Sequence, residues 1–324
     1  MKLSGRRLLV TGGAGLIGSH LAATLAEDND VTVVDDCSTG DRERVPDDVR
    51  FAEADLTDPD TVTEVVTADL DAVFHLAAAK AVNADRPRAQ FEGNAAMTYN
   101  LLERMDEVGV RSIAFTSSST VYGEAPRPTP EDYAPLAPIS VYGATKLAEE
   151  GLLSAYAGSN GFTAWVFRFA NIPGPMFDGS VIPDFVEKLS ADPETLTILG
   201  DGRQEKSYLH VEECVDAMRY VVETAGGAND APNTRREGPG EQGAVHTFNL
   251  GTRTTTSVRR IADIVAEEMG LDPEYEFTGG DRGWVGDVPK MRLSVEKLAA
   301  LGWEPPLSSD ESVRKAVRQL TGER

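Results

Sequence analysis

The chain has few of the residues that hold together small extracellular or metal-binding proteins. Among its 324 residues only two are cysteines, Cys37 and Cys214, and only four are histidines. Two widely separated cysteines cannot build a disulfide framework or a cysteine-based zinc site. No run approaches the roughly 18–20 uncharged apolar residues that span a bilayer, and Met1–Thr11 has no signal-peptide core. We therefore expect no metal, no membrane insertion and a cytoplasmic location.

Lysine is scarce as well, with eight lysines beside 23 arginines, and these 31 bases face 53 acids. The resulting net charge of −22 repels nucleic acid phosphates and anionic membrane surfaces alike, so neither is an expected partner. Acid-rich, lysine-poor surfaces resemble those of salt-adapted proteins, whose self-repulsion is tolerable where salt screens it. The charge pattern thus predicts a halophilic protein, and 41% apolar with 26% charged residues predicts a globular one.

Short apolar runs alternate with helical patterns through the first half of the chain. This alternation predicts an α/β fold, a doubly wound parallel sheet of the Rossmann type with helices on both faces. The expected strands are Leu8–Thr11, Val31–Asp35, Val49–Glu53, Ala72–Leu76, Ser112–Ser117 and Ala164–Phe169, and the expected helices are Ile17–Ala26, Asn94–Val108 and Val141–Tyr156.

The second half of the chain is more irregular, with proline and glycine punctuation. We predict a dinucleotide-binding domain over residues 1–170 and a smaller mixed α/β substrate domain over residues 171–324, partly interleaved with the first. Residues 226–243 show no periodicity and predict a mobile surface insertion.

A glycine-rich turn follows the first expected strand, with the sequence TGGAGLIG from Thr11 to Gly18. Glycines there let the backbone approach a pyrophosphate, and Gly18 lets the following helix pack close to the strand. Asp35 ends the next strand, where a carboxylate would bind the hydroxyls of an adenosine ribose. Because Asp35 and Asp36 would repel a 2′-phosphate, the pattern favours NAD over NADP.

Two further strand ends lie where a dinucleotide would pass. Asp55 and Leu56 follow the third strand and are placed to flank an adenine ring, and the small residues after His75 would leave room for the cofactor. A histidine inside an apolar strand is more often a hydrogen-bonded core residue than a catalyst, so we expect His75 to be structural.

Tyr142 and Lys146 lie four residues apart on one face of an expected helix. A phenol titrates near pH 10, and a lysine about 4 Å away supplies roughly the 4 kcal/mol needed to bring it near 7. Tyr142 could then act as a base at neutral pH. The serine-rich run Ser117–Gly123 ends the preceding strand, where this type of sheet places ligands.

Taken together, these motifs resemble the extended short-chain dehydrogenase/reductases, specifically their nucleotide-sugar epimerase/dehydratase branch, over nearly the whole chain. The branch members most similar to it are the UDP-glucose (UDP-galactose) 4-epimerases. The motifs are Thr11–Gly18, Asp35, Asp55-Leu56, His75–Ala78, Asn94 with Thr98, Ser117–Gly123, Pro138–Lys146, Arg168 with Asn171 and Gly174-Pro175, Gly200–Gly202, His210-Val211, Phe248–Gly251 and Leu301–Trp303.

The resemblance implies a catalytic set of Ser118, Tyr142 and Lys146. Tyr142 would take the proton of the sugar 4-hydroxyl, Ser118 would bond the same oxygen, and Lys146 would hold the nicotinamide ribose and lower the Tyr142 pKa. Residues expected to contact NAD are Gly12, Gly15, Leu16, Ile17, Gly18, Asp35, Asp36, Ser38, Thr39, Gly40, Asp55, Leu56, Leu76, Ala77, Ala78, Lys80, Asn94, Tyr142, Lys146 and Phe169.

Within the family, dehydratases and decarboxylases carry a glutamate just before the Val-Tyr-Gly or Leu-Tyr-Gly motif, often after an aspartate. Here Thr120 and Ser119 stand in those places, and neither supplies a carboxylic acid or base. Elimination chemistry is therefore disfavoured. Lys80, in the run Ala79–Val82, resembles the lysine that approaches the cofactor phosphates in UDP-galactose 4-epimerases.

The motifs for the sugar nucleotide depart from the family pattern in two places. Lys206 stands where relatives have an arginine that binds the diphosphate, and the family's Arg-x-Gly-Asp begins here with Trp284. Arg282 is our candidate for the missing cation. Residues expected to contact the substrate are Lys80, Ser118, Thr120, Asn171, Ser180, Val181, Lys206 and Arg282.

The leading hypothesis is an NAD-dependent 4-epimerase that interconverts UDP-glucose and UDP-galactose. A UDP-glucuronate 4-epimerase, which could use Arg292 for the acidic sugar, and another NDP-sugar oxidoreductase or dehydratase remain alternatives. A non-catalytic NAD-binding redox sensor is the alternative from a different class, disfavoured by the intact catalytic set. Relatives often dimerise through helices that here would be Asn94–Val108 and Val141–Tyr156, so we expect a homodimer.

Overall fold

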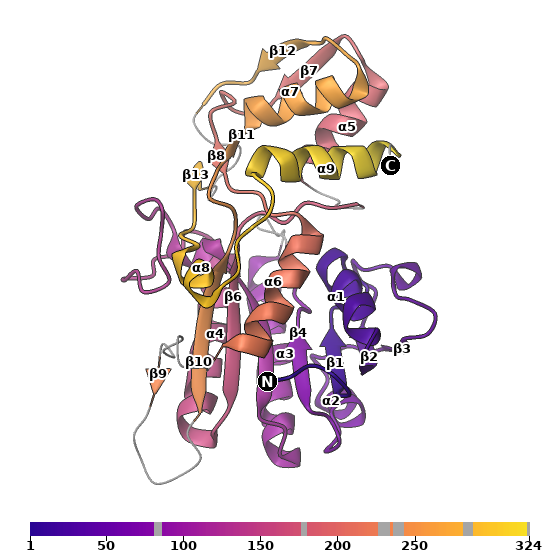
Figure 1. Cartoon of the computed structure of the whole chain (residues 1–324), viewed down its shortest axis with the longest axis vertical. Coiled ribbons are helices and arrows are strands. Elements are labelled where there is room, and N and C mark those ends of the chain that lie inside the picture. The colour runs from indigo at the N-terminus through magenta and orange to yellow at the C-terminus, as the bar shows by residue number, and fades with distance from the viewer. Residues whose placement is uncertain (81–85, 176–179, 226–233, 236–242, 281–287, 323–324) are drawn as a thin grey trace.

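The computed structural model describes residues 1–80, 86–175, 180–225, 234–235, 243–280 and 288–322. Its largest element is an eight-stranded sheet in the order β3-β2-β1-β4-β5-β6-β10-β9 (Figure 1). All neighbouring pairs are parallel except β10 and β9. The strands are β1 (Arg7–Thr11), β2 (Asp30–Asp35), β3 (Arg50–Glu53), β4 (Ala72–His75), β5 (Ser112–Ser118), β6 (Thr163–Phe169), β10 (Ala244–Leu250) and β9 (Thr234–Arg235).

Helices cover both faces of this sheet because its central strands are apolar on both sides. Successive residues of β1 illustrate this, since Leu9 and Val10 belong to two different apolar cores. One core is shared with α1 (Leu16–Ala26) and α6 (Val211–Thr224). The other is shared with α2 (Pro59–Val65), α3 (Pro87–Val108) and α4 (Val141–Asn160). The predicted doubly wound parallel sheet is confirmed.

The strand order reverses between β1 and β4, which are neighbours in the sheet although β2 and β3 lie between them in sequence. Sheets of this type bind ligands beyond the carboxyl ends of the strands at such a reversal. The chain turns from β1 into α1 at this edge.

A second group of elements gathers at one end of the molecule (Figure 1). It consists of α5 (Val181–Ala191), α7 (Val258–Met269), α9 (Ser309–Thr321) and the parallel pair β7 (Thr195–Ile198) and β12 (Glu274–Phe277), which share a third core. A three-stranded sheet of β11 (Thr256–Ser257), β8 (Glu205–Lys206) and β13 (Lys290–Met291) completes it. Shorter elements are η1 (Arg42–Arg44), η2 (Ser119–Tyr122) and α8 (Glu296–Leu301).

The six predicted strands all form, with ends within one residue of those expected. Helix α3 begins at Pro87 rather than Asn94, because the side chain that its first two turns bury is the polar Gln90 while Phe91 is exposed, so these turns show no apolar period. Helix α4 continues past Tyr156 to Asn160 and ends at Gly161, whose φ of 75° stops the helix. The predicted insertion at 226–243 lies mostly outside the described residues, and Thr234–Arg235 within it pairs with the start of β10. No helix in the described ranges is long and apolar enough to cross a membrane.

Candidate active site

The glycine-rich turn is packed so tightly that side chains cannot be added at its first and last positions. A Cβ on Gly12, whose φ is +69°, would lie 2.5 Å from the amide nitrogen of Ala77, and one on Gly18 would lie 2.2 Å from the Gly12 carbonyl oxygen. Helix α1 begins at Leu16, and its N-cap residue Gly15 has no side chain to bond the first N–H groups, which leaves them for an external acceptor. This arrangement fits a pyrophosphate at the helix N-terminus.

Asp35 ties the end of β2 to this turn. One carboxylate oxygen accepts a hydrogen bond of 2.9 Å from the Ala14 amide, and the other accepts one of 2.9 Å from the Cys37 amide. Each oxygen keeps a lone pair that a ribose hydroxyl can use. Gly40 leaves space beside the carboxylate, because a Cβ there would come within 3.0 Å of Asp35 Oδ1.

The neighbouring residues predicted to contact the cofactor have different environments. Asp36 and Ser38 are exposed and bonded to each other, with Ser38 Oγ 2.7 Å from Asp36 Oδ1. Thr39 is also exposed. Asp55 is exposed, and Leu56 is buried in the core shared with α2, α3 and α4. Leu16 and Phe169 are buried in the opposite core, with Ile17 partly buried against it.

The backbone after β4 is held by a buried amide side chain on α3. Asn94 is fully buried, and its Oδ1 accepts from the Ala79 amide at 2.8 Å while its Nδ2 donates to the Ala79 carbonyl at 3.1 Å. Gln90 donates to the same carbonyl at 2.9 Å. The segment that holds Leu76, Ala77, Ala78 and Lys80 is therefore fixed beside the glycine-rich turn.

His75 is a core residue, as the sequence predicted. It is fully buried, with Nδ1 2.8 Å from the Thr11 hydroxyl and Nε2 3.0 Å from the Thr98 hydroxyl. Burial, and then the nearby Lys146 charge, lower the pKa of His75 to about 3, so the ring stays neutral at physiological pH.

Ser118 and Tyr142 lie on elements that pack against each other at the end of β5. Ser118 ends the strand, and its hydroxyl accepts a 2.9 Å bond from the Thr120 hydroxyl. Helix α4 is capped by Ser140, and a Cβ on Gly143 would lie 2.8 Å from the Thr120 carbonyl oxygen. The chain thus brings Ser118 and Thr120 next to the first turn of the helix that carries Tyr142.

Lys146 lies one helical turn further along α4 and is almost fully buried. Its Nζ is 3.3 Å from Oε2 of Glu149, whose side chain is fully buried, and 4.6 Å from the centre of the Phe115 ring. Burial raises the pKa of Tyr142 above its ordinary value, and the Glu149 charge raises it further. The predicted lowering of the Tyr142 pKa is therefore wrong for the chain by itself, because burial disfavours the phenolate and the negative charge of Glu149 opposes it further.

A second buried ion pair fixes the end of β5. Arg168 on β6 binds Glu150 through two bonds, Nε to Oε1 at 3.0 Å and Nη2 to Oε2 at 2.7 Å. Ser117 donates to Oε1 of the same carboxylate at 2.5 Å, and Arg168 donates to the Tyr122 hydroxyl at 2.8 Å. The pair thus anchors the residue that precedes Ser118.

The residues predicted to contact the sugar nucleotide lie on several segments of the chain. Asn171, just after β6, links this strand to the end of β8, since its backbone amide donates to the Ser207 carbonyl at 3.2 Å. Ser180 precedes α5 with its hydroxyl buried and without a partner among the described residues, and Val181 packs on the third core. Lys80 is exposed and Lys206 is half-buried. Arg282 lies outside the described residues.

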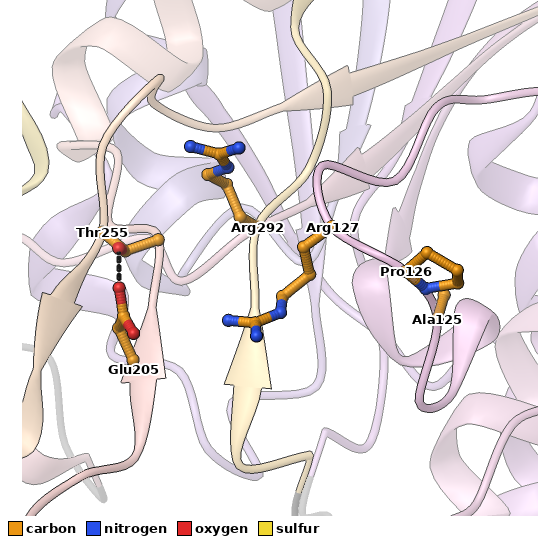
Figure 2. Close-up of a pocket in the computed structure, with 6 residues that line it drawn as sticks. All are labelled: Ala125, Pro126, Arg127, Glu205, Thr255 and Arg292. Atoms are coloured by element: carbon orange, nitrogen blue, oxygen red, sulfur yellow. Dashed lines mark hydrogen bonds between the residues drawn. The ribbon is translucent and has the colours of Figure 1, made fainter.

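A cavity of about 480 Å³ lies beside β8, lined by Ala125, Pro126, Arg127, Glu205, Thr255 and Arg292. Figure 2 shows Glu205, bonded to the Thr255 hydroxyl, on one side of the two arginines and Pro126 on the other. Glu205 and Lys206 are successive strand residues and point to opposite faces. Arg292, which lines this cavity together with Glu205, therefore lies on the face opposite Lys206.

Three features of the site escape sequence reasoning. Glu149, Glu150 and Thr11 all bond to groups at the site, yet only the three-dimensional structure identifies their partners. The spacing of Lys146 and Glu149, which puts both on one helix face, was the available signal for the first. Within the described ranges, no cluster of three His, Cys, Asp or Glu side chains could hold a metal ion.

Comparison with known proteins gives consistent matches along the chain. The family described as "NAD dependent epimerase/dehydratase family" matches residues 8–233. A protein of Mycolicibacterium smegmatis named UDP-glucose 4-epimerase is 33% identical over 326 residues, covering 96% of this chain and 97% of that protein.

Solved structures agree. The crystal structure of a UDP-galactose 4-epimerase is 38% identical with a TM-score of 0.85, covering 98% of this chain and 99% of that one. The UDP-glucose 4-epimerase of Thermus thermophilus, crystallised with NAD, is 32% identical with a TM-score of 0.84, covering 98% of this chain and all of that one.

Proposed function

Because the chain belongs to the NAD dependent epimerase/dehydratase family, we propose that it is an NAD-dependent 4-epimerase that interconverts UDP-glucose and UDP-galactose. One observation carries this proposal. The chain brings Ser118, Tyr142 and Lys146 to the carboxyl edge of the sheet beside an uncapped helix N-terminus, in a sequence similar to UDP-glucose 4-epimerases along its whole length.

The residues at the strand reversal fit NAD. The helix N-terminus at Gly15 binds the pyrophosphate, and Asp35 binds the adenosine ribose. The carboxylates of Asp35 and Asp36 exclude a 2′-phosphate by charge. When bound, NAD supplies a reversible hydride acceptor for sugar C4.

The chain's own residues transfer the proton and bind the sugar oxygen. Tyr142 takes the proton of the 4-hydroxyl and later returns it, while Ser118 holds the same oxygen by a hydrogen bond. Lys146 holds the nicotinamide ribose. The 4-keto sugar formed in this way flips within the pocket, and hydride then returns to the other face of C4. One proton and one hydride therefore leave the sugar and return to it in each cycle.

The residues around the serine-rich turn favour epimerisation over elimination. Loss of water needs a carboxylic acid or base near the sugar, and the two positions before Val121 hold Ser119 and Thr120. Thr120 donates to Ser118 through its hydroxyl and so shapes the surroundings of the sugar oxygen. We assign Asn171, Ser180 and Lys206 to the other side of the sugar nucleotide.

We further propose a homodimer formed through α3 and α4. Phe91 and Tyr99 are 38% and 46% exposed and lie eight residues apart on α3, so they share one face of the helix. Large exposed aromatic side chains on one helix face are typical of protein interfaces. Light scattering of Tyr99→Ser against the unchanged chain tests this, with a shift to monomer expected.

The test of the proposed function is a product assay without added NAD. The purified protein is incubated with UDP-glucose or UDP-galactose in molar KCl, and the sugars are separated. We expect the other 4-epimer to form, and we expect Tyr142→Phe to reduce turnover at least 100-fold, the usual contribution of a positioned acid–base group, while sugar-nucleotide binding is retained. Accumulation of NADH or of a dehydrated keto sugar would contradict the proposal.

A further inference from the structure

A line of hydrogen bonds connects the end of β1 with the helix that carries Tyr142 and Lys146. The Thr98 hydroxyl donates to Glu149 Oε1 at 2.7 Å. The same hydroxyl oxygen lies 3.0 Å from His75 Nε2, and His75 Nδ1 lies 2.8 Å from the Thr11 hydroxyl. All four side chains are fully buried.

The direction of this line follows from the acceptor at its end. A carboxylate can only accept hydrogen bonds, so the Thr98 hydroxyl donates its proton to Glu149. The Thr98 oxygen must then accept a hydrogen bond from His75 Nε2–H. His75 Nδ1 then accepts from the Thr11 hydroxyl, which fixes a neutral tautomer of the ring. Every proton in the line points toward Glu149, as a negative charge there requires.

Glu149 also faces Lys146. Their side chains are 0% and 2% exposed, and the distance from Lys146 Nζ to Glu149 Oε2 is 3.3 Å. Both atoms lack a hydrogen-bond partner among the described residues, so each is held by the charge of the other. A lone buried ammonium would be costly, and the carboxylate compensates it.

We infer that Glu149 is a positioning residue that holds the Lys146 ammonium and sets the net charge felt by Tyr142, so that the pH range of catalysis depends on Glu149. The inference rests on the proposed function of Tyr142 as the base. It concerns a residue three positions after Lys146 that does not itself touch the sugar.

The groups that face Glu149 are few. On its own helix they are Lys146 and Tyr142, and the titratable His75 on β4 reaches Glu149 through the Thr98 hydroxyl. Helix α3 contributes the uncharged Thr98, and β5 contributes the Phe115 ring beside Lys146. Glu150, the next residue, faces Ser117 and Arg168 instead. A change of charge at Glu149 therefore acts on Tyr142 with little competition.

The expected effect has a definite sign. The Glu149 carboxylate opposes formation of the Tyr142 phenolate, in keeping with the raised Tyr142 pKa. Glu149→Gln keeps the size of the side chain and an oxygen that can accept from Thr98, and it removes only the charge. Losing one nearby charge in a buried site should move the Tyr142 titration about one pH unit or more toward acid.

Two measurements on the NAD-loaded protein test this. The first is the pH profile of epimerisation, whose acid limb should move about one unit lower in Glu149→Gln. The second is the near-ultraviolet absorbance of tyrosinate during a pH titration, with Tyr142→Phe used to identify the Tyr142 signal. Glu92→Gln, which removes an exposed charge from α3, is the matched control and should leave both midpoints in place.

A further variant separates charge from structure. Thr98→Val removes the hydrogen bond to Glu149 and leaves the Glu149 charge in place. This variant should therefore have a lower melting temperature, while the acid limb of its pH profile should move little. If Glu149→Gln does not fold, Glu149→Asp can be used, because its shorter side chain moves the negative charge away from Lys146. The midpoint of the Tyr142 titration should still differ between Glu149→Asp and Thr98→Val.

The outcomes distinguish the inference from the proposed function. Epimerisation with both midpoints unchanged in Glu149→Gln overturns the inference and leaves the function intact. A Tyr142 titration that moves in a protein with no epimerase activity supports the inference about charge and rejects the function.

Discussion

Replacing Arg168 by methionine should destabilise the protein by several kcal/mol, and the structure shows why. The Arg168 and Glu150 side chains are 7% and 11% exposed, and the replacement leaves the Glu150 carboxylate buried without its cation. Removing one partner of a buried pair costs about 3–5 kcal/mol. The variant also takes a donor from the Tyr122 hydroxyl and the Glu131 carbonyl, which points to the upper part of that range.

This loss converts to a measurable change in melting temperature. For 324 residues, an unfolding entropy of about 2.1 cal/mol/K per residue gives roughly 0.7 kcal/mol/K, so the melting temperature should fall by about 4–7 °C. Calorimetry at fixed salt and saturating NAD measures it. Because Glu150 also accepts from Ser117, next to Ser118, turnover should fall as well.

A double-mutant cycle with Glu150→Leu tests whether the Arg168 and Glu150 charges depend on each other. If the pair acts as described, the double variant should be clearly more stable than the sum of the two single losses predicts, because both charges are then gone. A coupling energy below about 1 kcal/mol, the range of exposed ion pairs, would show that the two charges are not effectively buried together.

Three other groups lend themselves to direct tests. Asp35→Asn should weaken NAD binding about 10-fold or more in calorimetric titration and reduce discrimination against NADP, since a charged ribose acceptor is worth about 1.5–3 kcal/mol. Equal affinity in Asp35→Asn and in the control Asp28→Asn, which removes an exposed charge just after α1, would remove Asp35 from the ribose site. Burial raises the pKa of Glu213 to about 7, above its unfolded value, so its stabilising contribution is present at low pH and is lost as the pH rises through 7. Glu213→Gln should therefore raise stability by about 1–3 kcal/mol at pH 8 and by much less at pH 5, and a pH-independent effect in denaturant titrations would contradict this. The melting temperature should increase as KCl is raised from about 0.05 to 3 M. The reason is that the repulsion among 22 excess negative charges reaches about 30 Å at 0.01 M salt and about 3 Å at 1 M. A melting temperature that does not change with salt, together with full activity in dilute buffer, would show that the acidic composition is incidental.

The sequence alone determined the features that depend on neighbours along the chain. The glycine-rich turn from Gly12 to Gly18 is set by a strand, a turn and a helix in immediate succession, and Asp35 is the end of the next strand. Tyr142 and Lys146 share a helix face because of their spacing. The alternation of strands and helices likewise predicted the parallel sheet, since each element's apolar pattern is local.

Tertiary structure decided which distant groups meet, and therefore the charge at the site. Glu149 and Glu150 lie three and four residues after Lys146 on one helix, so helical spacing allows either of them to face the lysine. Packing of α4 against α3 and β5 turns Glu149 toward Lys146 and Thr98, while the end of β6 brings Arg168 to Glu150. The pairing of β13 with β8 similarly places Arg292 on the face away from Lys206. Apart from the pair Lys146 and Glu149, these contacts join residues that are not neighbours in sequence, and the energy of a buried charge depends on the groups that the fold brings to it.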